Sequence, residues 1–385
     1  MGDTDDTTRR IRALRLRNQG LVPGARPWAT APDVARGMLA LQAQDPLGVL
    51  FALSVRASER PSEATVVAAL DAAEVVRNRP SRGTLQVTAP EDLRWLTGLA
   101  AARSNAAAVK RRPQLGVTEE MVEGVGDVLR AQLGGGRVAT RPDLVAACAA
   151  AGFELDGQQA GHVLRHHTEV MTIVFADHGG RVDSFALADE YLPTRRDLTR
   201  DEALAELATR YFDARGPATP QCLGWWANLS MADVRAAIAG AGDTLEQVEL
   251  GGTTFLVGAG GGHATRDEID AALAEPLLLP PFDEYLLGYR HRDAIVTPEH
   301  FEAVVPGRNG MFRPLVVVDG EIVGRWSRKL TGTTVAMTIE LFDDTPAVVR
   351  SAATRKGLER RAAEYGEFLG REPVLTVSSA GPGPG

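Results

Sequence analysis

The stretch TRPDLVAACAAAGFELDGQQAGHVLRHHTEVMTIVFADHGGRVDSFAL, residues 140–187, decides the fold. It opens with a helix start at Thr140 and Pro142, continues with a second helical run, GQQAGHVLRHHTEVM, and ends with two strand-like runs around a turn at residues 178–180. Helices followed by a hairpin are the elements of a winged helix, in which the hairpin lies beside the recognition helix. The stretch therefore predicts a DNA-binding module.

The same order of elements occurs twice more, although no repeat is visible residue by residue. Before it, a basic helix RRIRALRLR precedes helices that start at Thr30 and Ser62, and the strands VVRNR and TLQVTA follow. After it, Thr219 caps QCLGWWAN, Ser230 caps MADVRAAIAGA, and LEQVELGG leads into TTFLVGAG. We therefore expect three tandem winged-helix modules.

The pattern changes beyond the glycine-rich run at residues 258–262. RPLVVVDG, EIVGRWSR and TVAMTIELF read as strands joined by tight turns, which predicts a small C-terminal antiparallel β-barrel before a helix over residues 346–369. The predicted fold class is α+β. The predicted domains are residues 1–112, 113–197 and 198–262 for the three winged helices, 263–377 for the barrel and final helix, and 378–385 for a disordered tail.

Composition favours a folded protein without a membrane segment. The 385 residues are 44% apolar and 24% charged, and no run is long and apolar enough to cross a bilayer. We therefore expect a cytoplasmic bacterial protein, associated with the nucleoid when bound to DNA. A net charge of −8 argues against nonspecific coating of nucleic acid, so DNA binding requires a local basic patch. The lysines are few: Lys110, Lys329 and Lys356.

The sequence favours neither a metal nor a cofactor. Cys148 and Cys222 lie far apart and indicate two buried thiols. His162 and His166 share one helical face, but no carboxylate or cysteine stands at metal spacing beside them, and a recognition helix explains the cluster equally well. The run GAGGG lacks the lysine and the βαβ context of a nucleotide-binding loop.

The most distinctive polar motif is Gln42-Ala43-Gln44-Asp45, which ends an apolar run and is followed by Pro46. We interpret it as the end of an amphipathic helix stopped by the proline. On spacing alone, a polar helix terminus explains the motif. The alternative is that the two glutamines point into a shared cleft, which requires the backbone to leave helical geometry there.

Four blocks, LALQAQDP, VVRNRPSRGTLQVTAPEDLRWL, LLPPFDEYLLGYRHR and GMFRPLVVVDGEIVGRW, resemble successive blocks of the bacterial winged-helix DNA glycosylases. That family includes self-resistance enzymes for DNA-alkylating antibiotics and crosslink-unhooking relatives. The resemblance runs from about residue 10 to residue 343. It implies three winged helices and a small barrel forming a concave DNA-binding body, with a catalytic Gln-x-Gln or Gln-x-Asp motif. Members often carry histidine after Arg-Gly-Thr-Leu, where this chain has Gln86.

The resemblance implies that Gln42 and Gln44 are catalytic. We expect DNA contacts from basic residues of the ribbon and the second module, namely Arg77, Arg79, Arg82, Arg111, Arg112, Arg165 and His166. We expect a substrate cleft to include Asp45, Gln86, Asp283, Tyr285 and Arg290.

The predicted function is a monofunctional DNA glycosylase that hydrolyses the N-glycosidic bond of bulky or cationic N-alkylated purines of the N7-alkylguanine type, in repair or self-resistance. We expect a monomer that acts on double-stranded DNA, without a cofactor, a metal or a membrane partner. The first alternative is a non-catalytic winged-helix DNA-binding protein or regulator. The second is a small-molecule enzyme or drug-sequestering protein, consistent with the acidic net charge.

Overall fold

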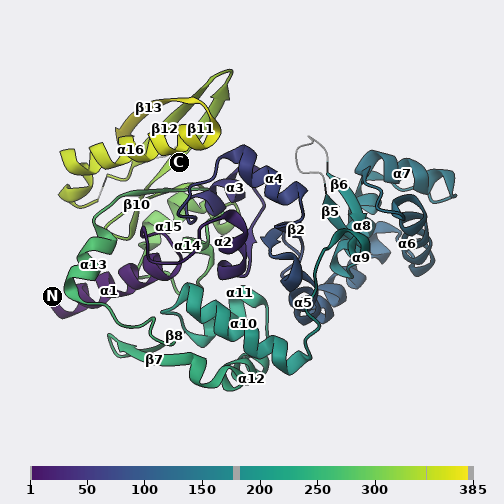
Figure 1. Ribbon diagram of the computed structural model, residues 1–385, viewed down its shortest axis with the longest axis horizontal. Helices are drawn as coiled ribbons and strands as arrows, with labels where there is room; N and C mark the ends of the chain where they lie inside the picture. Colours follow the sequence, from purple (N-terminus) through teal and green to yellow (C-terminus); the bar gives the residue numbers. More distant parts are fainter. Residues whose placement is uncertain (1, 177–182, 344, 380–385) are drawn as a thin grey trace.

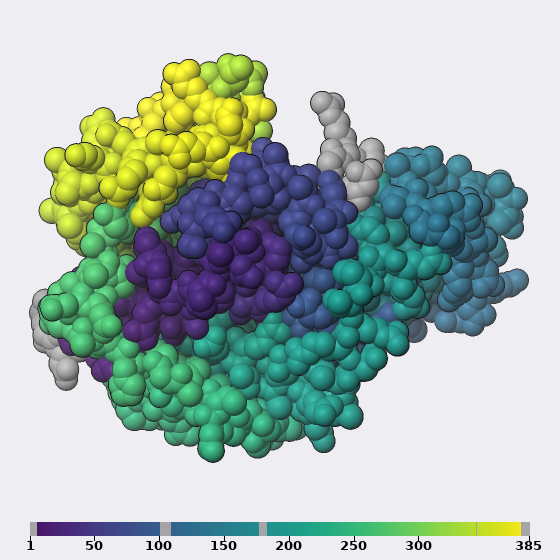
Figure 2. Space-filling view, in the orientation of Figure 1, coloured from purple at the N-terminus to yellow at the C-terminus, as the bar shows by residue number. Residues whose placement is uncertain are grey.

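The computed structural model describes residues 2–176, 183–343 and 345–379. The fold is mixed α/β. Three units that each combine helices with an antiparallel hairpin are followed by a C-terminal unit built on a larger sheet (Figure 1). In the view of Figure 2 the C-terminal unit and the second unit project on either side of the first, leaving a notch between them at the upper edge.

The first unit carries a three-stranded sheet of order β1-β3-β2. Its elements are α2 (Ala31–Met38), β1 (Leu41–Gln42), α3 (Pro46–Ser54), α4 (Glu63–Asp71), β2 (Val76–Asn78) and β3 (Gln86–Thr88), followed by the long α5 (Pro90–Arg111). Thr30 begins α2 with a capping box, because its side chain accepts from the Asp33 backbone while the Asp33 carboxylate accepts from the Thr30 backbone. The expected helix starts at Thr30 and Ser62 are both confirmed.

The second unit follows the predicted order, and its sheet has the order β4-β6-β5. Its elements are α6 (Glu119–Leu133), β4 (Ala139–Thr140), α7 (Arg141–Ala150), α8 (Gly157–Glu169), β5 (Ile173–Ala176), β6 (Ser184–Leu187) and α9 (Ala188–Tyr191). Thr140 forms a capping box with Asp143, as the sequence predicts. The hairpin turn expected at residues 178–180 lies outside the described residues.

The third unit pairs three helices with the hairpin β7–β8. Its elements are α10 (Arg200–Arg215), α11 (Pro220–Ala227), α12 (Met231–Ala241), the short 3-10 helix η2 (Gly242–Thr244), β7 (Leu245–Leu250) and β8 (Thr253–Gly258). Ser230 caps α12 as expected. Thr219 precedes α11 but makes no capping hydrogen bond, because its hydroxyl donates to the Cys222 sulfur instead.

The C-terminal unit is an open five-stranded sheet of order β13-β12-β11-β10-β9 across the described residues. Its elements are α13 (Arg266–Leu273), β9 (Leu277–Leu279), α14 (Glu284–Leu287), α15 (Pro298–Val304), η3 (Pro306–Arg308), β10 (Leu315–Val318), β11 (Glu321–Thr331), β12 (Thr334–Leu341), η4 (Ala347–Arg350), α16 (Ala352–Leu369) and β13 (Glu372–Ser379).

The predicted closed antiparallel barrel is therefore not found. β13 pairs in parallel with β12, and β9 and β13 stand at opposite edges of the sheet. The helix α16 packs against β9, β12 and β13 (Figure 1), so a helix covers the apolar face that a closed barrel would bury inside itself. Ser378 and Ser379, expected in a disordered tail, belong to β13.

One continuous hydrophobic core links the units. It includes Met38 of α2, Leu129 of α6, Phe212 of α10 and Ile339 of β12. The first helix, α1 (Gly2–Asn18), contacts α13 and α10, so it joins the third and C-terminal units although it precedes the first unit in the chain.

Candidate active site

The Gln-x-Gln motif begins on a short strand and ends in a bend, between two helices. Helix α2 ends at Met38, and Leu39 turns the chain with a left-handed φ of 64°. β1 follows, and α3 begins at Pro46. The interpretation of the motif as a helix end stopped by Pro46 is therefore wrong, because a proline at the first position of a helix begins it.

The strand β1 places Gln42, and Gln44 follows it in a bend. Gln42 pairs with Gln86 of β3, and the backbone N–H of Ala43 donates to the Leu85 carbonyl. Leu41 and Ala43 are buried in the core, whereas Gln44 lies in the bend between β1 and α3. Gln42 is half-buried and Gln44 is exposed.

The surroundings of Gln42 are polar and neutral. The Thr84 hydroxyl donates to Gln42 Oε1 at 3.1 Å. Gln86, which is 3% exposed, lies opposite Gln42 on one side and Asn78 on the other, and it accepts a hydrogen bond from the Ser81 hydroxyl. The structure thus brings the expected cleft residue Gln86 to Gln42 and forms a row of amides across the three strands.

Asp45 has two structural partners. Its carboxylate accepts from the Gly48 backbone at the start of α3 and forms an ion pair with Arg328 of β11 at 2.7 Å. These contacts hold the end of the Gln42–Gln44 segment against the C-terminal sheet. The carboxylate next to the glutamines is therefore engaged as a helix cap and ion-pair partner.

A buried charge cluster fixes the other end of the segment. Arg215, with a fully buried side chain, donates to the carbonyls of Met38 and Ala40 at 2.8 and 2.7 Å. Its charge is balanced by Glu284, which also accepts from Trp226 at 2.9 Å. The backbone that enters β1 is thereby anchored to the third and C-terminal units. No local sequence pattern points to this cluster, because its members are far apart in the chain.

Three residues with left-handed backbone lie around the strand. Leu39 precedes it, Arg82 lies in the loop that supplies Thr84, and Phe282 follows Pro281, which packs against the start of α3 at Gly48. Positive φ is costly for residues other than glycine, so it persists where surrounding contacts impose it, and such residues concentrate at functional sites.

The ribbon arginines have different environments. Arg77 pairs with Asp183 at 3.1 Å and lies over the Phe175 ring. Arg79 donates to the Gly83 carbonyl at 2.9 Å, and burial lowers its pKa. Arg82 lies over the Trp225 ring with its guanidinium carbon 4.4 Å from the centroid, and burial also lowers its pKa. These three residues belong to the same unit as the Gln42 strand.

The basic residues of α8 meet the ribbon from the second unit. Arg165 binds Glu169 at 2.7 Å and approaches Gly83 so closely that a Cβ there would lie 2.0 Å from its Nη2. His166 contacts Arg112 at 3.3 Å, and its pKa is lowered by burial and by that arginine. Arg112 is buried and pairs with Glu119, whereas Arg111 is exposed.

Two expected cleft residues lie in the interior. Asp283 forms a fully buried ion pair with Arg56, accepting from both terminal nitrogens at 2.8 and 3.0 Å. Tyr285 is also buried and donates to the Gly320 carbonyl at 2.6 Å. Neither side chain is open to a substrate, so both are assigned structural roles. The block LLPPFDEYLLGYRHR, which contains both residues, therefore belongs in part to the protein core.

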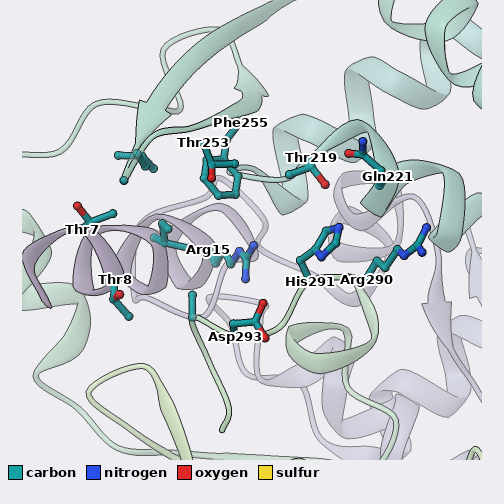
Figure 3. A pocket seen from close by; sticks show the side chains of 14 residues that line it. Thr7, Thr8, Arg15, Thr219, Gln221, Thr253, Phe255, Arg290, His291 and Asp293 are labelled. Carbon is teal, nitrogen blue, oxygen red and sulfur yellow. The ribbon is translucent and has the colours of Figure 1, made fainter. Parts of the chain in front are cut away.

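Arg290 lines a separate pocket of about 780 Å³ between α1, the β7–β8 hairpin and the loop after α14 (Figure 3). His291 lies beside it, and Arg15 reaches toward the same space from α1. The residues that line this pocket do not include the glutamines of β1. Arg290 is therefore not brought to the Gln42 strand.

The arginines of α1 bind other parts of the chain. Arg9 pairs with Asp270 and Asp319, Arg12 pairs with Glu321, and Arg17 donates to backbone carbonyls of the loop after β8. Arg9 and Arg12 are thus paired with carboxylates inside the fold, and Arg17 is held by backbone carbonyls. Cys148 and Cys222 are free and buried, as expected.

Within the ranges that the structure describes, no group of three or more His, Cys, Asp or Glu residues is placed to hold a metal ion. Among the same residues, no helix has the length and apolar character needed to span a membrane.

Comparisons with known proteins agree with this architecture. The interstrand DNA cross-link repair glycosylase of Streptomyces sahachiroi is 28% identical over 335 residues, which cover 83% of this chain and 87% of the relative. The solved structure of the Streptomyces sahachiroi DNA glycosylase AlkZ superposes with a TM-score of 0.76 at 24% identity, covering 96% of this chain and 99% of that one, and so shows a shared fold. A family model described as DNA glycosylase AlkZ-like matches residues 35–368. Because that match spans most of the chain, including the Gln42 strand, the protein is a DNA glycosylase and belongs to the AlkZ-like family.

Proposed function

We propose that this glycosylase hydrolyses the N-glycosidic bond of cationic N-alkylated purines, of the N7-alkylguanine type, with Gln42 and Gln44 as the catalytic residues. The observation that carries the proposal is the neutral amide of Gln42 on β1, held by Thr84, with Gln44 exposed in the bend that follows the strand. The neighbouring carboxylate of Asp45 is engaged by the α3 N-terminus and by Arg328.

Neutral amides suit a leaving group that already carries positive charge. Cleavage of an N-glycosidic bond passes through an oxocarbenium-like state, and a neutral base must normally be protonated as it leaves. An N7-alkylated guanine departs without that proton. The enzyme then needs to position a water molecule and the sugar, and amide carbonyls can accept hydrogen bonds from that water, whose surplus proton passes to the solvent once its oxygen has bonded to the sugar carbon. The cationic base should therefore be released and the unmodified base retained.

DNA docking by winged-helix modules is part of this proposal. Each of the three units presents helices next to a hairpin, and that combination binds duplex DNA in winged-helix proteins. Bulky adducts fit an open surface better than a closed base-flipping pocket. The Streptomyces sahachiroi relative is named for interstrand crosslinks, so a crosslinked N7-alkylguanine is the first bulky substrate to test.

The two alternatives predict different behaviour. A non-catalytic regulator would bind DNA without releasing base, and membership of a DNA glycosylase family favours catalysis. A drug-sequestering protein would bind the free alkylating compound in the absence of DNA.

We further propose that water, and not an amine, displaces the base. A glycosylase that also cuts the strand needs an amine to form a Schiff base with the sugar. Lys110 and Lys356 lie on other elements than the Gln42–Gln44 segment, namely on α5 and α16. Lys329 follows Arg328 on β11, and alternation along the strand turns it to the face opposite the Asp45 contact.

The test incubates the protein with duplex DNA that contains 7-methylguanine and measures released base by mass spectrometry, with sodium borohydride present in a parallel reaction. We expect free 7-methylguanine, an abasic strand that breaks only after alkali treatment, and no protein–DNA adduct. Absence of base release would refute glycosylase activity on this lesion, and a stoichiometric borohydride adduct would make an amine the nucleophile.

A further inference from the structure

Two arginines from other parts of the chain lie over the ring of Trp225, a residue of α11. The guanidinium carbon of Arg82, in the β2–β3 loop, is 4.4 Å from the indole centroid, and that of Arg292, after α14, is 4.8 Å from it. Arg292 also lies 5.2 Å from the Phe301 ring and 5.9 Å from the Phe312 ring. The three residues, called here the Arg82–Trp225–Arg292 stack, join the first, third and C-terminal units.

The two arginines of the stack lack a carboxylate partner among the described residues. Three other arginines near the Gln42 strand do have one: Arg77 binds Asp183, Arg215 binds Glu284 and Arg328 binds Asp45.

The two arginines of the stack also make few hydrogen bonds to the described residues. The guanidinium of Arg82 makes no hydrogen bond or ion pair that the structure shows. Arg292 donates from Nε to the Leu286 carbonyl at 2.9 Å, and its Nη2 is buried without a partner. Donors of this kind are normally satisfied, so an unpaired one indicates a missing acceptor.

Electrostatics of the stack favour an incoming anion. Burial lowers the pKa of both arginines, that of Arg292 to about 10, and each guanidinium still carries its charge at neutral pH. Their mutual repulsion adds to the lowering at Arg292. The indole and phenyl faces compensate part of this cost through cation–π attraction. An anion placed between or beside the two guanidinium groups would compensate the rest.

Contacts connect the stack to both ends of the segment from Gln42 to Gly48. Arg82 stands two residues before Thr84, whose hydroxyl holds Gln42. On the other side, Phe312 packs against Phe282 with ring centroids 5.9 Å apart, and the adjoining Pro281 contacts the start of α3 at Gly48. An anion bound at the stack would therefore lie beside β1.

We propose that the Arg82–Trp225–Arg292 stack binds a backbone phosphate of the DNA strand that is positioned at Gln42 and Gln44. This inference rests on the proposed function, because it takes DNA as the ligand and the glutamines as the reacting centre. The damaged base is an unsuitable occupant, since its positive charge would be repelled by two arginines. A phosphate oxygen matches guanidinium donors in charge and geometry.

The experiment measures the affinity for undamaged duplex DNA by fluorescence anisotropy at several salt concentrations. We expect Arg82→Gln and Arg292→Gln each to weaken binding on the order of tenfold at low salt. Each should also reduce the slope of log affinity against log salt by about one, because one phosphate contact is lost. Arg292→Lys keeps the charge and should restore most of the slope.

The matched control is Arg200→Gln, since Arg200 is an ion-paired arginine bound to Asp233 at 2.8 Å, and its slope should equal that of the native protein. Thermal unfolding checks that each variant is folded. If Arg292→Gln does not fold, Arg82→Gln still tests the proposal, because Arg82 lies in a loop. Unchanged slopes in Arg82→Gln would overturn the phosphate site. Because undamaged DNA is used, this result is independent of base release. The phosphate site can be refuted while base excision is observed, and base excision can be absent while the phosphate site is confirmed.

Discussion

At the scale of single residues, the polar groups that the sequence predicts for the site are those that stand in a recognisable motif or block. Gln42 and Gln44 are recognisable from a motif, and Gln86 from a block that follows it. Arg215, Trp225 and Arg292 were not identified, because each acts through contacts with residues far away in sequence. The same limit explains Asp283 and Tyr285, whose polar side chains are satisfied inside the core.

His167 gives a residue-scale prediction about pH. Its ring is 4% exposed, and its two nitrogens contact Thr172 and the Val122 carbonyl. Burial, with the nearby His166, lowers its pKa from 6.5 to about 4. The unfolded chain therefore binds a proton below pH 6.5 that the folded chain refuses until about pH 4, so stability falls as the pH is lowered through this window.

Urea unfolding at pH 7 and pH 5 measures this effect. We expect the free energy of unfolding to be about 2 kcal/mol lower at pH 5 than at pH 7. His167→Gln should lose most of that difference, whereas His263→Gln, at an exposed position, should keep it. An equal pH dependence in native protein and His167→Gln would contradict the assignment.

At the scale of elements, local signals predicted most helices because capping residues announce their starts. Thr30, Ser62, Thr140 and Ser230 all cap as expected. Pro46 was misread because a proline is compatible with both the end of one helix and the start of the next. The strand β13 and its parallel pairing with β12 were missed, since pairing across α16 is a long-range property that strand patterns do not encode.

The Arg215–Glu284 pair gives an element-scale prediction, because it joins α10 and α14 to the backbone that enters β1. Glu284→Gln leaves the buried guanidinium without a balancing charge. We expect a loss of about 3 kcal/mol in the free energy of unfolding, measured with urea. Base release should also slow, since the carbonyls of Met38 and Ala40 lose a rigid anchor.

Glu359→Gln is the control for this change. Glu359 pairs with Arg355 on the surface of α16 at 3.4 Å, and both side chains are more than half exposed. Its removal should alter stability by less than about 0.5 kcal/mol. Equal stability losses in Glu284→Gln and Glu359→Gln would show that the buried pair does not anchor the strand.

At the scale of the whole molecule, the sequence predicted the order of units better than their assembly. The three helix-and-hairpin units and the C-terminal sheet occur in the expected order, but one core runs through all of them and α1 packs on units distant in sequence. The net charge of −8 describes the molecule as a whole. Many of the described arginines form ion pairs with internal carboxylates, so we expect DNA affinity to depend mainly on arginines that have no such partner.

The central claim is that the amides of Gln42 and Gln44 position the water that hydrolyses the bond, and single-turnover release of 7-methylguanine from duplex DNA tests it most directly. We expect Gln42→Ala and Gln44→Ala each to slow release on the order of 100-fold or more while DNA affinity stays within a few-fold, because the amides act on the reacting centre and not on phosphates. Gln247→Ala, an exposed glutamine of β7, should release base at the native rate. Native rates in both Gln42→Ala and Gln44→Ala would contradict the assignment of catalysis to this strand.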